Sequence, residues 1–229
     1  MKEQDFTISN QAEEYLEAIY HLENEKGNAK TMDLAKELGV VPGSITNTIE
    51  ILERKELVTH EPYKGVTLTK TGQKIALSVL RRHRLAERLL TDVLHLAWSE
   101  VHDPACKLEH ALTPKILKSL ETKLEHPQKC PHGNPIPKED GSFQEDDSIP
   151  LTELKSGENG IIQKIVHEKT SILESLENFG LVPDSHVKII KKPFSGSLEL
   201  EVDGKKKNVE QMIAKHVHVT LPRFLRTEI

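Results

Sequence analysis

The chain has 229 residues, of which 36% are hydrophobic, 29% are charged and only 4% are aromatic. It contains two cysteines, its amino terminus is rich in carboxylates, and no apolar run approaches the roughly 18 residues of a membrane span. These features exclude a disulfide-stapled secreted protein, a membrane-spanning chain and a fibrous protein. They predict a cytoplasmic protein with reduced thiols.

The first third of the chain predicts helices followed by a hairpin. Apolar residues recur at helical spacing over residues 11–22, and Thr31 is predicted to cap a second helix. A third helix is predicted over residues 42–57, because Pro42 suits a first helical turn. Two β-rich runs within residues 57–69 predict a hairpin. This order is the winged helix-turn-helix arrangement, which we expect over residues 1–72.

The third of these helices would present short polar side chains to a major groove by its amino-terminal end. The residues expected to face DNA are Pro42, Gly43, Ser44, Thr46, Asn47 and Thr48, with Tyr63 and Lys64 on the wing. The formal net charge is −5, but residues 28–92 carry eleven Lys/Arg against eight Asp/Glu, so phosphates can still be attracted locally. The alternative is a helical packing unit whose Ser and Thr residues only cap helices.

Residues 73–140 combine helical periodicity with metal-ligand side chains. A long helix is predicted to run through Leu96, and two short helices are predicted to start at Asp103-Pro104 and Thr113-Pro114. The ligand-type residues are His83, Glu87, His102, Cys106, Glu109 and His110. Their nitrogen, sulfur and oxygen atoms suit a first-row divalent metal. A second group, Cys130-Pro131-His132, is a weak metal signal, and we assign it a structural role.

The last part of the chain predicts a separate β-rich domain. Pro, Gly and acidic residues dominate residues 126–150, and we interpret the later part, residues 141–150, as a flexible linker. Residues 151–229 contain four β-rich runs, a predicted turn at Asp203-Gly204 and one helix over residues 171–179. This texture is typical of a small SH3-like barrel. The predicted fold class is mainly α with a small β component.

At these residues the sequence resembles the diphtheria-toxin-repressor family of metal-dependent transcriptional repressors, which includes iron-dependent and manganese-transport regulators. The densest similarity lies in HRLAERLLTDVLHLAWSEVHDPACKLEH, with CPHGNPIP as a second signature. The resemblance implies a winged-helix domain, a helical metal-binding and dimerisation domain over residues 73–140, and an SH3-like (FeoA-like) carboxy-terminal domain. It also places Ser44 and Asn47 where family members face DNA bases.

The resemblance further implies two metal sites. Glu14, Cys106, Glu109 and His110 correspond to the regulatory site. His83, Glu87 and His102 correspond to an ancillary site that a carboxy-terminal residue completes, either His167 or Glu168. Iron-type members have methionine at the position of Glu14 and cysteine at that of Cys106, whereas manganese-type members have carboxylates at both. This chain mixes the two patterns, so Mn(II) and Fe(II) both remain open as its metal.

The predicted function is a homodimeric, metal-dependent repressor that binds double-stranded operator DNA and controls metal-uptake genes. It is not predicted to be an enzyme, because the chain lacks a HExxH motif, a Gly-rich phosphate loop and a Ser/His/Asp arrangement. The alternatives are a metal-buffering protein, a metal-dependent hydrolase that uses the same ligands, and a winged-helix regulator whose histidines are structural. No membrane partner is expected.

Overall fold

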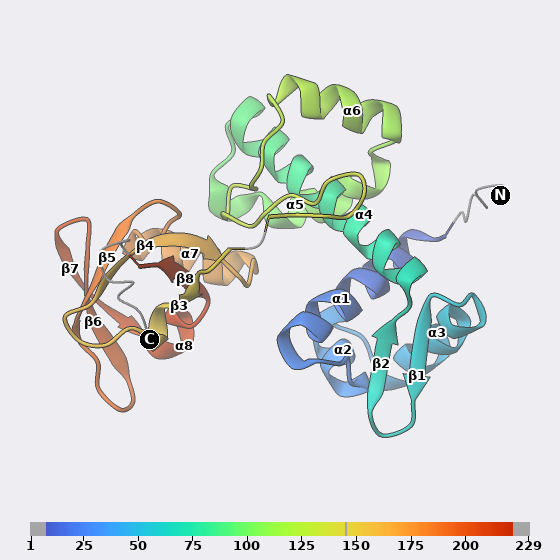
Figure 1. Cartoon of the computed structure of the whole chain (residues 1–229), viewed down its shortest axis with the longest axis horizontal. Helices are drawn as coiled ribbons and strands as arrows, with labels where there is room; N and C mark the ends of the chain where they lie inside the picture. The colour runs from blue at the N-terminus through green and yellow to red at the C-terminus, as the bar shows by residue number, and fades with distance from the viewer. Residues whose placement is uncertain (1–7, 145, 222–229) are drawn as a thin grey trace. The chain divides into compact units, whose positions relative to one another are not determined.

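The computed structural model describes residues 8–144 and 146–221, drawn in colour in Figure 1. The chain forms two compact units. The first holds residues up to Arg82 together with Pro137–Ser142, and the second holds His83–Ile136 together with the residues from Phe143 onward. Among the described residues, each helix is too short or too polar to cross a bilayer.

Three helices and a two-stranded hairpin make up most of the first unit. The elements are α1 (Asn10–Lys26), α2 (Thr31–Leu38), α3 (Pro42–Arg54), β1 (Val58–Glu61) and β2 (Gly65–Leu68), followed by the start of α4 (Lys70–Arg88). Ser9 caps α1 by accepting a hydrogen bond from the Ala12 amide. The prediction that Thr31 caps α2 is wrong: Thr31 is the first helical residue, and Lys30 precedes it without a side-chain cap.

The core of the first unit joins all three helices to the hairpin. Its fully or nearly fully buried members include Tyr15, Leu16, Ile19, Leu34, Ile45, Ile49, Leu52 and Leu57. The hairpin is antiparallel, with Val58 opposite Leu68 and Glu61 opposite Gly65. The predicted helix over residues 42–57 is shorter than expected, because α3 ends at Arg54 and Leu57 turns into this core.

Short helical segments follow α4 in the second unit. They are the π-helical turn η1 (Leu89–Val93), the 3-10 turn η2 (Trp98–Glu100), α5 (His102–Leu108), the 3-10 turn η3 (Glu109–Ala111) and α6 (Pro114–Lys123). The prediction of a helix through Leu96 is therefore wrong, since the α-helix stops at Arg88.

Only one of the two predicted Pro-containing caps is confirmed. Thr113 caps α6 by accepting from the Ile116 amide, and Pro114 opens the helix. The start predicted at Asp103-Pro104 is wrong, because α5 already begins at His102. Proline tolerates this position since the first-turn amides have no partner within the helix.

A six-stranded antiparallel sheet forms the carboxy-terminal part of the second unit. Its strands are β3 (Ile149–Pro150), β4 (Asn159–Ile165), β5 (His186–Lys191), β6 (Ser197–Val202), β7 (Lys205–Glu210) and β8 (Val217–Thr220). Their order is β3-β8-β4-β5-β6-β7, so the sheet has two edges and does not close into a complete barrel among the described residues. The 3-10 turn η4 (Leu151–Glu153), α7 (Thr170–Phe179) and the short α8 (Gln211–Ala214) complete this part.

The predicted elements of this sheet are largely confirmed. Asp203 and Gly204 have φ values of 45° and 80° and join β6 to β7, as expected for a tight hairpin turn. The helix predicted over residues 171–179 is α7, which ends at Gly180 in the left-handed region. β3 lies inside the predicted linker, because Ile149 and Pro150 pair with β8.

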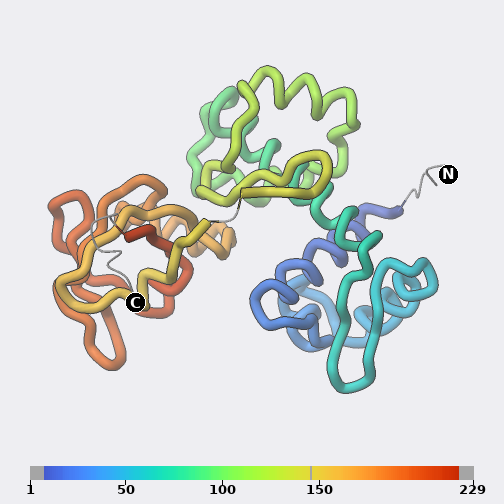
Figure 2. The backbone as a smooth tube through the Cα atoms, viewed as in Figure 1, coloured from blue at the N-terminus to red at the C-terminus, as the bar shows by residue number. Residues whose placement is uncertain are grey.

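The segment between α6 and β3 is neither helix nor strand, yet part of it is buried. Figure 2 draws residues 124–144 of this stretch as an irregular tube that follows α6. Cys130, His132, Asn134 and Ile136 are each at most 7% exposed. We call residues 130–134 the CPHGN loop.

Candidate metal centre and DNA-facing surface

Helix α4 carries two buried ligand-type residues one turn apart. His83 and Glu87 lie on one face because they are four residues apart. His83 Nε2 donates to Glu87 Oε1 at 3.0 Å, and its Nδ1 donates to Glu109 Oε2 at 2.7 Å. All three side chains are almost completely shielded from solvent.

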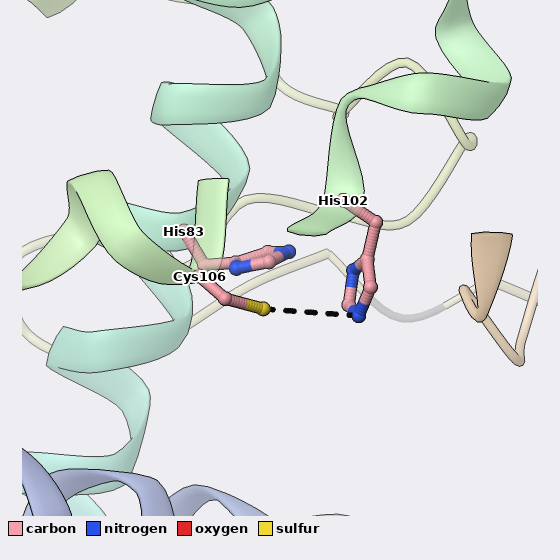
Figure 3. Close-up of side chains that lie close together, drawn as sticks. All are labelled: His83, His102 and Cys106. Atoms are coloured by element: carbon pink, nitrogen blue, oxygen red, sulfur yellow. Dashed lines mark hydrogen bonds between the residues drawn. The ribbon is translucent and has the colours of Figure 1, made fainter. Parts of the chain in front are cut away.

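Helix α5 brings two further ligand-type residues to His83. Figure 3 shows the side chains of His83, His102 and Cys106 converging, with Cys106 Sγ 3.8 Å from His102 Nε2. One donor atom from each of the three lies within 4.8 Å of the others. His102 and Cys106 are neighbours because they occupy successive turns of α5.

The CPHGN loop supplies two more donors close to Glu87. His132 Nδ1 lies 3.1 Å from Glu87 Oε1 and 3.5 Å from Glu168 Oε1. The Cys130 thiol donates to Glu168 Oε1 at 3.8 Å. We call Glu87, Cys130, His132 and Glu168 the Glu87 cluster, because one donor atom of each lies within 4.8 Å of the others.

Of the two candidates for completing the ancillary set, the structure brings Glu168 to it. Glu168 forms a second group with His83, Glu87 and His102, again within 4.8 Å. Asn134 Nδ2 holds this carboxylate by donating to Glu168 Oε1 at 2.6 Å. His167 points elsewhere: its ring stacks on that of His216, with centroids 5.0 Å apart.

The predicted regulatory residues fall in both units. His110 Nε2 lies 3.4 Å from Glu109 Oε1, and Cys106 belongs to the group with His83 and His102. Glu14 is an exposed residue of α1 in the first unit. The four-residue regulatory set thus remains a prediction.

The histidines around Glu87 have raised pKa values because acidic groups surround them. Burial alone would lower the pKa of His83, but Glu87 and hydrogen bonds to Cys106 and Glu109 raise it well above its usual value. The pKa of His102 rises to about 10 despite its burial, because Cys106 and the Glu87 carboxylate lie close to its ring. The pKa of His132 is likewise raised against burial, chiefly by Glu87.

The carboxylates respond in the opposite direction. Burial would raise the pKa of Glu87, but His132 and His83 lower it well below its usual value. For Glu168, burial and the charge of Glu87 act upward, yet His132 and Arg84 bring its pKa down to about 2. Two carboxylates and several imidazoles are therefore held together as a buried charge network.

The donors of this network fit a transition-metal ion. Three buried atoms, Glu87 Oε2, His102 Nδ1 and His132 Nδ1, have no hydrogen-bond partner among the described residues. Buried polar atoms without partners are costly, and a cation would give such an atom a partner. Glu87 belongs to one candidate ligand group with His102 and to another with His132. His132 also has the usual outer support of a metal-bound imidazole, because its Nε2 donates to the Trp98 carbonyl at 2.8 Å and leaves Nδ1 toward the cluster.

Sequence reasoning gave Cys130 and His132 a structural role and missed their approach to Glu87 and Glu168. Both residues lie on a loop, so no helical spacing relates them to α4 or α5. The available signal was the combination of a thiol and an imidazole two residues apart in a chain that already carried other ligands.

The predicted DNA-facing residues lie at an exposed surface of the first unit. Pro42, Gly43, Ser44, Thr46 and Asn47 are exposed at the start of α3, whereas Thr48 is half-buried. Ile45 and Ile49 point the opposite way, into the core. On the wing, Tyr63 is fully exposed with a φ of 67°, and Lys64 Nζ lies 2.6 Å from Glu61 Oε2.

Three family models match the chain in succession. They are the iron dependent repressor N-terminal DNA binding domain at residues 7–66, the iron dependent repressor metal binding and dimerisation domain at residues 69–138, and the FeoA domain at residues 149–221. We therefore call residues 149–221 the FeoA domain.

Individual relatives match over most of their length. The iron-dependent repressor IdeR of Mycobacterium leprae is 32% identical over 222 residues, which cover 92% of this chain and 91% of that protein. The diphtheria toxin repressor of Corynebacterium diphtheriae is 31% identical over 192 residues, or 83% of each chain.

Solved structures agree with these matches. A manganese-dependent transcriptional repressor in complex with manganese superposes with a TM-score of 0.85 at 31% identity, covering 92% of this chain and all of that one. IdeR of T. acidophilum gives a TM-score of 0.79 at 30% identity, covering 92% and 97%. With the fold, the ligand-type residues and three successive domain matches in agreement, the chain belongs to the diphtheria-toxin-repressor family.

Proposed function

We propose that this protein is a metal-activated transcriptional repressor that binds operator DNA as a homodimer and senses Mn(II) or Fe(II). The main observation behind this proposal is the continuity of α4. This helix begins at Lys70, directly after the hairpin of the winged helix, and contains His83 and Glu87 of the metal centre. The family is one of transcriptional repressors, not of enzymes.

The chain's residues are poised to exchange protons for a cation. Without metal, His83, His102 and His132 neutralise the buried carboxylates as imidazolium ions. A bound divalent ion would supply that positive charge instead, held by Glu87, Cys130, His132 and Glu168, with His83 and His102 beside them. An imidazole that held the ion would be a neutral donor, and its proton would leave to solvent.

We assign Glu14, Cys106, Glu109 and His110 to a second, regulatory site. Glu14 belongs to the DNA-binding unit and the other three to the second unit. A metal that acts as a switch must prefer one state of the protein, and a complete switch needs about 5 kcal/mol of preference for that state. A site built from one helix alone could not couple metal to the geometry of the DNA-reading surface.

The donor sets explain why iron and manganese both remain candidates. Cys106 and Cys130 offer soft sulfur, whereas Glu14, Glu87 and Glu168 offer hard oxygen. We infer that the regulated genes include those for metal uptake and that the protein acts in the cytoplasm. We also propose the domain boundaries 1–72, 73–140 and 151–229, with residues 141–150 as linker.

For DNA reading, we propose that Ser44 and Asn47 contact base edges from the exposed start of α3. The neighbouring Pro42, Gly43, Thr46 and Thr48 line the same end of this helix. On the wing, Tyr63 and Lys64 would reach phosphates or the minor groove.

The test is fluorescence anisotropy of a labelled duplex from the protein's own promoter region, titrated anaerobically at fixed salt. Chelator, Mn(II) and Fe(II) are compared side by side. Tight binding that appears only with metal supports the proposal, and the order of the two metals identifies the effector. Equal binding in chelator would remove the metal switch.

A further inference from the structure

Trp98 is the only tryptophan of the chain and lies on η2, between α4 and α5. It is not itself a ligand-type residue, yet it touches both the metal centre and the FeoA domain. Its ring lies edge-on to the ring of His132 with centroids 5.2 Å apart, and its carbonyl accepts the hydrogen bond from His132 Nε2 at 2.8 Å.

The same residue is packed against the FeoA core. The indole contacts the buried apolar cluster that includes Leu173 and Leu176 of α7. The next residue reinforces this contact, because the buried Ser99 hydroxyl donates to Glu177 Oε2 at 2.6 Å. Residues 98–99 thus connect α7 to the helical part of the second unit by apolar packing and one hydrogen bond.

The CPHGN loop makes a second attachment on β4. The Ile165 amide donates to the His132 carbonyl at 2.9 Å, and Asn134 Nδ2 donates to the Ile165 carbonyl at 2.7 Å. Glu168 follows β4 by three residues. The contacts that seat the FeoA domain therefore also determine where His132 and Glu168 meet.

We propose that Trp98 is a positioning residue of the Glu87 cluster. Through its contacts, metal binding at this cluster is coupled to the packing of the FeoA domain against the helical part of the second unit. The proposal rests on the metal-site assignment made under the proposed function. The Trp98 carbonyl selects the His132 tautomer whose Nδ1 faces Glu87, and the indole keeps α7, β4 and hence Glu168 in place. Loss of the indole would separate the two halves of the ligand set without removing a ligand.

The test measures metal affinity, by competition with a chromophoric chelator, in variants of the 229-residue chain. Trp98→Ala is expected to weaken the tightest site about ten- to a hundredfold, as loss of outer support does at other metal sites. Trp98→Phe keeps an aromatic anchor and is expected to restore affinity to within a few-fold of wild type. Phe194→Ala, which removes a fully exposed aromatic residue of the FeoA domain, is the control and should bind as wild type.

Cys130→Ser separates this proposal from the one on which it rests. If Cys130→Ser binds metal with unchanged affinity and stoichiometry, the metal-site assignment fails. If Cys130→Ser loses affinity while Trp98→Ala retains it, the assignment stands and the role of Trp98 is overturned. Circular dichroism of each variant distinguishes misplaced ligands from unfolding. Ser99→Ala removes only the hydrogen bond to Glu177 and is therefore a smaller perturbation of the same contact.

Tryptophan emission gives a second readout that a purely structural role would not move. Because the single indole lies edge-on to the His132 ring, binding of diamagnetic Zn(II) at the Glu87 cluster should change the emission of the wild-type protein. The change in emission should be complete when the tightest Zn(II) site is filled. It should disappear in Cys130→Ser but persist in Phe194→Ala. Emission that stays constant while Zn(II) fills the site would contradict the coupling.

Discussion

The start of α3 and the Glu87 cluster both consist of polar side chains, but the first presents them to solvent and the second buries them. At the start of α3, Ser44 and Asn47 are exposed, while Ile45 anchors the helix in the core. In the cluster, Glu87 and His132 are fully buried and depend on each other for charge balance. Substitutions in the first region should therefore change recognition alone, whereas those in the second should change stability and metal binding together.

Removing the Glu87 carboxylate should have the largest effect. Glu87→Ala removes the carboxylate that the His83 and His132 rings share and leaves them only Glu109 and Glu168 as acidic partners. Breaking a buried ion pair costs about 3–5 kcal/mol. We expect the free energy of unfolding in urea, measured with chelator present, to fall by that amount. Glu87→Gln keeps the shape and isolates the charge. A fully stable Glu87→Ala protein would contradict the charge network.

Gly133→Ala should be next, because a Cβ atom at this position would lie 2.1 Å from the Gln163 carbonyl oxygen on β4. Overpacking of this kind costs about 1–3 kcal/mol, and here it would also push the CPHGN loop off the FeoA domain. Gly157→Ala is the matched control: Gly157 has a similar positive φ, but open space surrounds its missing Cβ. We expect lower thermal stability and weaker metal binding in the first variant only.

Asn47→Ala should alter DNA recognition without touching the second unit. If Asn47 reads a base edge, its loss should reduce discrimination between operator and mismatched duplexes by about 1–3 kcal/mol. Anisotropy with both duplexes at saturating metal measures this difference. Metal affinity and melting temperature should match those of the wild type. A change in either would contradict the expectation that substitutions at the start of α3 affect DNA recognition alone.

Proton release should accompany metal binding at the cluster but not DNA reading. The raised pKa of His102, about 10, means that its charge stabilises the metal-free fold below pH 6.5 and that this contribution is lost as the pH rises through 10. Metal must displace such protons, so apparent affinity should increase from pH 6 to pH 8. Calorimetry in two buffers of different ionisation enthalpy counts the protons released, and identical heats would contradict the assignment.

The wing should give the smallest effect. Lys64 is fully exposed and already paired with Glu61 at 2.6 Å, so Lys64→Ala should leave stability unchanged. If Lys64 contacts a phosphate, the slope of log affinity against log salt should decrease by about one, equally for specific and random duplexes. A sequence-dependent loss would instead place Lys64 against bases.

Local signals predicted much of the fold, and their failures have physical causes. The Thr113 cap and the Asp203-Gly204 turn were predictable because each depends on the conformational preference of one or two residues. The π-helical turn after Arg88 and the early start of α5 were not, because tertiary packing rather than propensity sets them.

The same distinction applies to the metal centre. His83 and Glu87 could be paired from the sequence, since four residues on a helix bring two side chains together. Cys130 and His132 reach Glu87 through the path of a loop and through its attachment to β4, which no spacing rule encodes. The position of the Glu168 carboxylate near Glu87 likewise depends on a tertiary contact, the hydrogen bond from the Asn134 amide.

The open sheet of the FeoA domain has one more consequence, for how copies of this protein associate. Exposed strand edges recruit strands from other chains and lead to aggregation. Here one edge, β3, is only two residues long and ends in Pro150, while the other, β7, begins with three consecutive lysines at residues 205–207. Both edges resist strand addition, since proline lacks the amide proton and neighbouring lysines repel one another. Self-association by sheet extension is thus disfavoured, which leaves the assembly of copies to surfaces outside this sheet.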